Sequence, residues 1–139
     1  MYALGVHSHE RRGALDASIV IEEHPIRVLS THLGLRPYER REQVQRILAT
    51  LGDDATSPVI LMGDVNEWLL WGRPLRWLHR AFHEARTPAT FPSRWPVFAL
   101  DRIWMRPAEQ LLTLAKHRSA LAKIASDHLP LVADIALPV

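Results

Sequence analysis

Cysteine is absent from this chain of 139 residues. The sequence therefore offers no disulfide framework, no thiolate metal site and no cysteine nucleophile. It also lacks any apolar run near the roughly 18 residues that a membrane-spanning helix needs. The basic stretch followed by an apolar core that marks a secretory signal is missing from its start. These absences predict a soluble protein located in the cytoplasm.

Neither sign of charge dominates, because 17 Lys and Arg residues stand against 15 Asp and Glu residues, for a net charge of +2. This small excess is weak evidence for a nucleic-acid partner. Apolar residues make up 47% of the chain and charged residues 23%, which is ordinary for a globular protein and argues against disorder. The length predicts a single domain over residues 1–139.

The hydrophobic pattern predicts a mixed α/β protein with paired antiparallel strands, of the α+β type. Residues 1–13 are expected to be irregular, and the apolar alternation over 15–22 predicts a strand. A turn at His24-Pro25 and a second β-rich run over 26–33 would complete a hairpin. The uniformly apolar run 59–62 predicts a strand buried on both faces. Helices are expected over 37–51 and 73–83, a proline-rich loop over 87–96, and further strands over 100–105, 111–115 and 129–137.

Four polar clusters stand at the ends of β-rich runs, where a rigid sheet commonly presents active-site residues. Their carboxylates and carboxamide could hold a hard divalent cation through oxygen, and their imidazoles could perform acid–base chemistry. Asp64 and Asn66 are two residues apart, so an extended backbone would point both side chains to one face. The clusters are Thr31-His32, Gly63-Asp64-Val65-Asn66, Asp101-Arg102 and Ser126-Asp127-His128.

Most of these clusters also have a purely structural interpretation. An Asp/Asn turn commonly follows a strand. A histidine at a strand end can simply form a hydrogen bond with a neighbouring group, and Asp127-His128 could be a capping pair. Asp101 is more informative, since a carboxylate inside an apolar strand needs a partner. Arg102 points to the opposite face, so we expect a histidine from another strand to be that partner. Trp68 and Trp71 flank the Asn66 loop and would either line a substrate cleft or belong to the core.

Taken in order, four stretches of the chain resemble the endonuclease/exonuclease/phosphatase superfamily, which has the fold of DNase I. They are RVLSTHLGL (27–35), ILMGDVNEW (60–68), LDRIW (100–104) and SDHLP (126–130). The resemblance implies a DNase I-like β-sandwich flanked by helices. It also implies a hydrolase of phosphoester bonds, acting on a nucleic acid, a phospholipid headgroup or an inositol phosphate.

The resemblance also implies a role for each matching residue. His128 resembles the general base that activates water, and Asp101 the carboxylate that orients it. Asp64 and Asn66 resemble the pair that positions the nucleophile and the phosphate. His32 resembles the histidine that stabilises the phosphate or assists the leaving group. Such chemistry needs an activated water and charge neutralisation on the non-bridging oxygens.

A Mg²⁺ or Mn²⁺ cofactor is implied as well, with Asp127 and Asp64 as the metal-site carboxylates. The sequence departs from the superfamily in lacking its leading metal-binding Asn and its Gln-Glu pair. We therefore expect the C-terminal part of the domain, without its N-terminal strands and with weak metal binding. An apolar sheet face would then be exposed and could form a homo-oligomer.

Two alternatives to an active enzyme remain open at this point. The chain could be a non-catalytic remnant, or a half-domain that depends on a partner. A weaker alternative is a basic nucleic-acid-binding module, for which a solvated surface is the competing interpretation. That module would use Arg11, Arg12, Arg40, Arg41, Arg73 and Arg76.

The sequence makes two geometric predictions about the candidate site. The first is that six polar residues meet in one cleft at an edge of a sheet. They are His32, Asp64, Asn66, Asp101, Asp127 and His128. The second is that Asp101 accepts a hydrogen bond from an imidazole nitrogen of His128, which would fix the tautomer of that ring.

Overall fold

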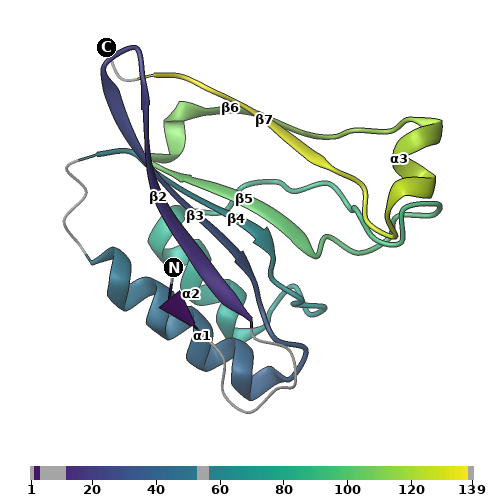
Figure 1. The fold of residues 1–139 in the computed structure, drawn as a ribbon. Coiled ribbons are helices and arrows are strands. Elements are labelled where there is room, and N and C mark those ends of the chain that lie inside the picture. The colour runs from purple at the N-terminus through teal and green to yellow at the C-terminus, as the bar shows by residue number, and fades with distance from the viewer. Residues whose placement is uncertain (1, 4–11, 53–56, 138–139) are drawn as a thin grey trace.

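The computed structural model describes residues 2–3, 12–52 and 57–137, and its elements are arranged in two sheets and three helices (Figure 1). Within these residues no helix is long and apolar enough to cross a membrane. The elements are β1 (Tyr2–Ala3), β2 (Gly13–Ile21), β3 (His24–His32), α1 (Pro37–Leu51), β4 (Val59–Asp64), α2 (Arg73–Phe82), β5 (Asp101–Arg106), a 3₁₀ turn (Ala108–Gln110), β6 (Leu111–Lys116), α3 (Ala120–Ala125) and β7 (Leu131–Ile135).

The larger sheet has five strands in the order β1-β2-β3-β4-β5, and β6 and β7 form a separate antiparallel pair. Strands β3 and β4 are parallel, with α1 as their crossover, while the other neighbours are antiparallel. Helices α1 and α2 cover one face of the large sheet, and the β6–β7 pair lies on the other side (Figure 1). The mixed α/β architecture predicted from the sequence is confirmed.

The core lies between the two helices and the large sheet. Helix α1 begins at Pro37, whose fixed φ suits a first helical position, and ends before Gly52, whose N–H donates to the Leu48 carbonyl. Because these helices are short, burial of their apolar stripes stabilises them more than intrinsic propensity does. The core side chains include Leu29, Val44, Ile47, Leu61, Leu75, Leu78, Phe82 and Trp104.

The first hairpin differs from the prediction in the position of its turn. Glu22 and Glu23 both have positive φ, of 49° and 70°, which is the backbone of a tight two-residue hairpin turn. His24 and Pro25 therefore belong to β3 rather than to the turn. The predicted irregular start is wrong for residues 2–3, which pair with β2 as β1; residues 4–11 lie outside the described part of the chain.

The second face of the large sheet is only partly covered. Leu15 and Ile19 of β2 are exposed, and Met62 of β4 is 36% exposed. The prediction that the 59–62 run is buried on both faces is therefore wrong. Within this run only Val59 and Leu61, which face the helices, are buried.

Gly63 brings the ends of β3 and β4 together. Its φ is +139°, and a Cβ atom at this position would lie 1.8 Å from the Thr31 carbonyl oxygen. A side chain would thus meet rigid backbone, so only glycine allows this close approach. The result is that the next residue, Asp64, is placed beside His32 at the sheet edge.

Candidate active site

Three of the predicted site residues form one row across the end of the large sheet. His32, Asp64 and Asp101 are register partners on β3, β4 and β5. Side chains at paired positions share one face of a sheet, here the face opposite the helices. His32 Nε2 lies 3.4 Å from Asp64 Oδ2. The strand register therefore brings two carboxylates and an imidazole together without any loop.

His128 reaches this row from the segment that joins α3 to β7. The segment is held in place by its neighbours: the Leu129 N–H donates to the Thr90 carbonyl at 3.0 Å, and the Phe91 ring lies 4.8 Å from the imidazole. His128 Nδ1 is 2.7 Å from Asp101 Oδ2, and its Nε2 is 3.9 Å from Asp64 Oδ2. The predicted Asp101–His128 hydrogen bond is confirmed.

Asp101 is fixed by a second hydrogen bond that the sequence did not reveal. Thr90 is fully buried, and its hydroxyl donates to Asp101 Oδ2 at 2.5 Å. Thr90 stands in the proline-rich loop, which offered no sign of a polar role beyond the presence of a threonine in it. Together Thr90 and His128 hold the carboxylate so that His128 keeps Nε2 directed toward Asp64.

Asn66 adopts a left-handed backbone with φ of 47° rather than the extended one that would align it with Asp64. Its backbone N–H donates to Asp64 Oδ1 at 2.8 Å, and its side-chain amide donates to the Leu33 carbonyl at 2.9 Å. The side chain is only 4% exposed. Asn66 thus orients Asp64 and links the end of β4 to the end of β3.

A buried ion pair holds the loop that follows β4. Arg40 Nε lies 3.4 Å from Glu67 Oε2, and both side chains are buried. Arg40 also donates to the Leu35 carbonyl at 2.5 Å. The interpretation of Arg40 as part of a nucleic-acid-binding surface is therefore wrong, because its guanidinium is used inside the fold.

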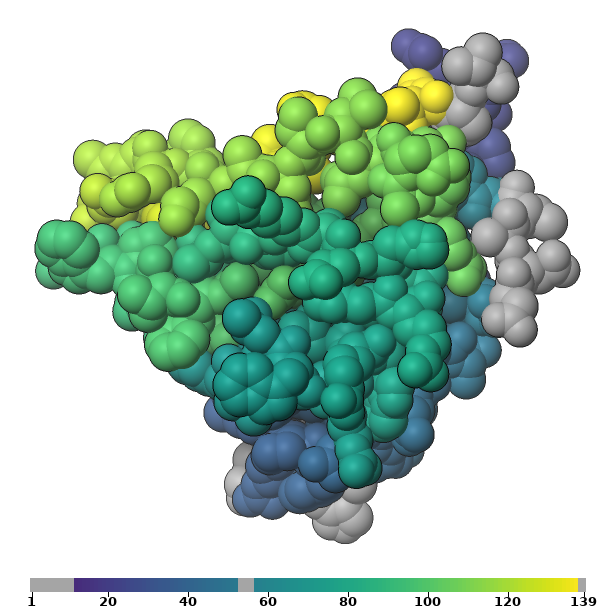
Figure 2. Space-filling model, turned by 180° about the vertical axis from the view of Figure 1, so that it is seen from behind, coloured from purple at the N-terminus to yellow at the C-terminus, as the bar shows by residue number. Residues whose placement is uncertain are grey.

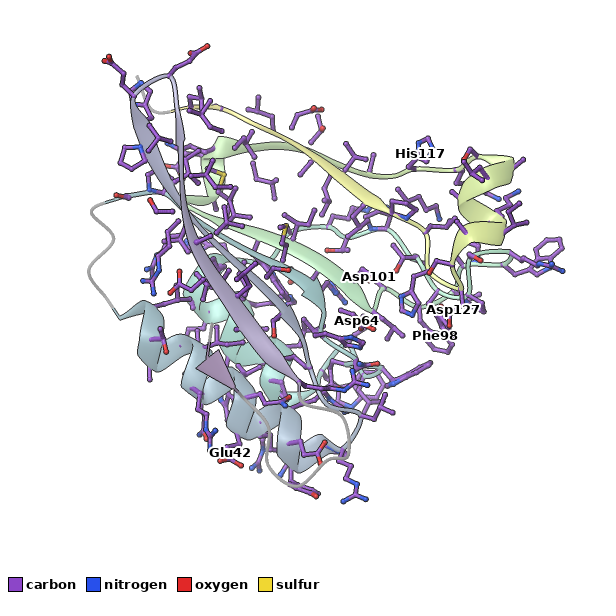
Figure 3. The ribbon with its side chains drawn as sticks, viewed as in Figure 1. Glu42, Asp64, Phe98, Asp101, His117 and Asp127 are labelled. Atoms are coloured by element: carbon purple, nitrogen blue, oxygen red, sulfur yellow. The ribbon has the colours of Figure 1, made fainter. Side chains whose placement is uncertain are left out.

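The six predicted residues all line one cavity of about 500 Å³, so their predicted convergence is confirmed. Figure 3 labels three of the carboxylates, Asp64, Asp101 and Asp127, close to Phe98 at the same end of the sheet. Trp68 lines the cavity and packs edge-on against Phe91 and Phe98, whereas Trp71 is exposed and outside it. The lining is His32, Leu35, Asp64, Asn66, Trp68, Phe91, Leu100, Asp101, Ser126, Asp127 and His128.

Two groups of the site, Asp64 and His128, have a raised pKa. Burial raises the pKa of the Asp64 carboxyl and the nearby Asp101 charge raises it further, against the lowering effect of the Asn66 N–H. Burial alone would lower the pKa of the His128 imidazole, but the hydrogen bond and charge of Asp101 raise it overall. Both groups therefore hold their protons more tightly than they would in water.

Metal-ligating atoms of Asp64, Asp101 and His128 lie within 4.8 Å of one another, and no other such group of three occurs among residues 2–3, 12–52 and 57–137. Two members already have hydrogen-bond partners, since Asp101 Oδ2 and His128 Nδ1 bond to each other. Mg²⁺ prefers six oxygens in near-octahedral geometry. Asp127 lines the cavity but is not in this group. The described residues thus fit an octahedral Mg²⁺ site poorly.

Comparison with known proteins agrees with this architecture. A profile of the Endonuclease/Exonuclease/phosphatase family matches residues 4–128, and the chain belongs to that family. It is 32% identical over 143 residues to the uncharacterized protein YbhP of Escherichia coli K12. The match covers 96% of this chain and 56% of YbhP, so the chain spans about half the length of this curated relative.

Solved structures share the fold at lower identity. An endonuclease/exonuclease/phosphatase from Bacteroides vulgatus matches with a TM-score of 0.73 and 19% identity, over 92% of this chain and 56% of that one. The human Nocturnin catalytic domain, solved with bound sulfate, matches with a TM-score of 0.67 and 20% identity, over 93% and 54%. The fold of this chain therefore corresponds to about half of each of these proteins.

The shifted histidine predicts a pH-dependent stability. Because the folded-state pKa of His128 is raised, its contribution to stability is fully present below the ordinary histidine pKa of about 6.5 and is lost as pH rises through the raised value. Asp101→Asn should lower the pKa of His128, because burial then acts without the opposing carboxylate. NMR titration of the imidazole and urea unfolding on either side of neutral pH measure the two effects.

Asp134→Asn on β7 removes one carboxylate outside the cavity and serves as the matched control, which should leave the His128 titration unchanged. An Asp101→Asn variant whose His128 titrates as in the parent would contradict the assigned hydrogen bond.

Proposed function

We propose that this chain carries the acid–base part of a phosphoester hydrolase. The single observation that supports this most directly is the Asp101–His128–Asp64 arrangement, in which His128 Nδ1 is 2.7 Å from Asp101 and Nε2 faces Asp64 in the cavity. Family membership supports the same reaction class. The substrate would be a phosphoester of a nucleic acid, a phospholipid headgroup or an inositol phosphate.

His128 would act as the general base. With Nδ1–H donating to Asp101, its Nε2 carries the free lone pair and can take a proton from a water in the cavity. Asp101 fixes this tautomer and stabilises the imidazolium that forms, as its effect on the pKa of His128 supports. Thr90 keeps Asp101 from rotating away. Proton removal by a positioned base contributes roughly 10² to 10⁴ in rate.

His32 would contact the phosphate, and Asn66 would act through Asp64. The His32 side chain is more than half exposed and lies beside Asp64, so its ring can reach an oxygen that enters the cavity. Asn66 orients Asp64 through its backbone N–H, and Asp64 would in turn position the attacking water. The leaving oxygen would take its proton from the protonated imidazole of His32.

The implied cofactor is Mg²⁺ or Mn²⁺, which would neutralise charge on the non-bridging oxygens when bound. Asp64 and Asp127 are the carboxylates of the cavity that are not already bonded to His128. Two carboxylates leave most of an octahedral shell to water and substrate, so binding would be weak. The small number of free carboxylates in the cavity is also consistent with the alternative function, a non-catalytic half-domain, as is the 56% coverage of YbhP.

Hydrolysis of bis(p-nitrophenyl) phosphate in the presence of Mn²⁺ tests the enzymatic proposal. His128→Ala should lower kcat by at least about 10², because it removes the imidazole that would take the proton. Asp101→Asn should lower kcat with little change in KM. His117→Ala, which removes an exposed histidine outside the cavity, should retain full turnover. Turnover that survives His128→Ala would contradict the proposal, and absence of turnover in the parent would favour the half-domain.

Calorimetric titration with Mg²⁺ or Mn²⁺ tests the weak site. We expect saturation only at millimolar metal, and its loss in Asp64→Asn, since that carboxylate contributes much of the negative charge. Glu42→Gln removes an acidic side chain on α1, far from the cavity (Figure 3), and should bind as the parent does. Micromolar affinity would contradict the proposal of a weak metal site.

The exposed sheet face leads us to propose self-association of the chain. Leu15 and Ile19 expose apolar surface on β2, and covering it would release water from both copies. Sedimentation equilibrium should detect dimers whose dissociation constant rises in Leu15→Ser/Ile19→Ser. Val20→Ser changes a more exposed apolar residue on the other face of β2 and should leave the dimer intact. A monomer at every concentration would rule out this association.

A further inference from the structure

One end of the molecule is an arm built from two segments distant in sequence, residues 92–98 and residues 116–125. The second segment contains α3, which projects beyond the end of the large sheet (Figure 1). Ser93 joins the two segments, because its hydroxyl donates to the Lys123 carbonyl at 3.3 Å and its N–H donates to the Asp127 carbonyl at 2.7 Å. Figure 2 shows the same end projecting when seen from behind.

The arm exposes large apolar side chains that the fold does not use. Trp95 is 82% exposed, Leu121 69% and Ile124 75%. Val97 is exposed as well. Isolated apolar residues on a surface are ordinary, but several on one projecting element mark an interaction site. Of the residues of α3, only Ala122 is buried, so the helix contributes little to the core.

The charge of the arm has one sign. Arg94, Lys116, Arg118 and Lys123 all lie on these two segments, and neither segment contains an Asp or Glu. Among the residues that the structure describes, none of the four has an ion-pair partner. A net charge of +2 for the whole chain means that this concentration of four cations is local. Such a surface attracts an anionic partner.

The arm is continuous with the candidate active site. The chain passes directly from α3 into Ser126, Asp127 and His128, all of which line the cavity. On the other segment, Phe91 packs against the His128 ring. A partner that touches the arm would therefore lie next to the cavity.

We propose that this arm docks on an anionic lipid surface, with Trp95, Leu121 and Ile124 entering the headgroup region and the four cations contacting lipid phosphates. Exposed aliphatic residues on a convex projection fit a lipid surface, whereas a protein partner would need a matching groove. A nucleic acid would use the cations and Trp95 but not the leucine and isoleucine. Docking does not depend on hydrolysis, so it can be tested separately from the proposed function.

Co-sedimentation of the 139-residue chain with vesicles tests the proposal. We expect binding to vesicles of phosphatidylcholine and phosphatidylglycerol in equal amounts, and at least tenfold weaker binding to phosphatidylcholine alone. Arg94→Gln/Arg118→Gln/Lys123→Gln should reduce binding at least tenfold, since each cation near such a surface contributes about fivefold. Leu121→Ser/Ile124→Ser and, separately, Trp95→Ser should each reduce it by a similar factor.

Matched controls locate the effect on the arm. Arg73→Gln/Arg76→Gln/Arg80→Gln removes the same charge from α2, and Val20→Ser/Ile21→Ser removes apolar surface at the β2–β3 turn, at the opposite end of the molecule (Figure 1). Both should bind as the parent does. The NMR signal of His128 checks that each variant keeps the fold beside the arm, and Trp95→Ser, which lies outside any helix or strand, tests the arm without altering α3.

Several outcomes would overturn the proposal. They are arm variants that bind as the parent does, control variants that lose binding equally, and equal binding of the parent to both kinds of vesicle. Absence of vesicle binding, with tight binding of a single-stranded oligonucleotide instead, would assign the arm to nucleic acid.

Discussion

Two carboxylates, Asp64 and Asp101, are cross-strand neighbours on β4 and β5, and like charges in directly opposite positions destabilise a sheet. The rest of the site depends on how this repulsion is relieved. Asp101 accepts hydrogen bonds from His128 and Thr90, while Asp64 accepts one from the Asn66 backbone and lies near both imidazoles. Burial is the main cause of the raised pKa of Asp64, and the Asp101 charge adds to it. The pKa of His128 is raised against the effect of burial by the hydrogen bond and charge of Asp101. Both pKa values thus depend on bringing Asp64, Asp101 and His128 together in a partly buried place.

That geometry is held by backbone and buried side chains as well as by the proposed catalytic groups themselves. Gly63 allows β3 and β4 to approach until a Cβ atom could not fit. The Asn66 amide and the Arg40–Glu67 pair bind the loop after β4 to the loop after β3. A buried pair of this kind adds little net stability, but it costs a great deal to break, so it fixes the position of the loop. Rigid support of this sort is what keeps functional side chains in a productive arrangement.

The sequence was sufficient to predict the helices of the core, the mixed α/β class and the convergence of the polar strand ends. Those features depend on local periodicity and on where apolar runs stop, and both can be read directly. The turn at Glu22–Glu23 could not be predicted, because two glutamates carry no preference for positive φ. The roles of Thr90 and Arg40 also escaped, since each depends on a partner distant in sequence. The exposure of Met62 could not be predicted for the same reason, because it too depends on segments distant in sequence. An apolar run indicates which side chains a strand could bury, but the neighbouring elements decide which face of the strand is covered.

The placement of a single domain over 1–139, the cytoplasmic location and the role assigned to each site residue stay predictions. The described residues supply the acid–base groups and the metal ligands of the proposed site to different degrees. The two groups of the proposed acid–base pair, Asp101 and His128, are joined by a hydrogen bond and supported by β4, β5, the Thr90 loop and the segment after α3. A metal site is less well supplied by the described residues. The oxygens that could serve it are few, and the Asp101 carboxylate is already hydrogen-bonded to His128. In the proposed function, proton transfer and charge neutralisation would therefore be physically separable. The first depends on a short-range hydrogen bond that needs no further ligand, whereas the second depends on how many oxygens can be gathered around one point.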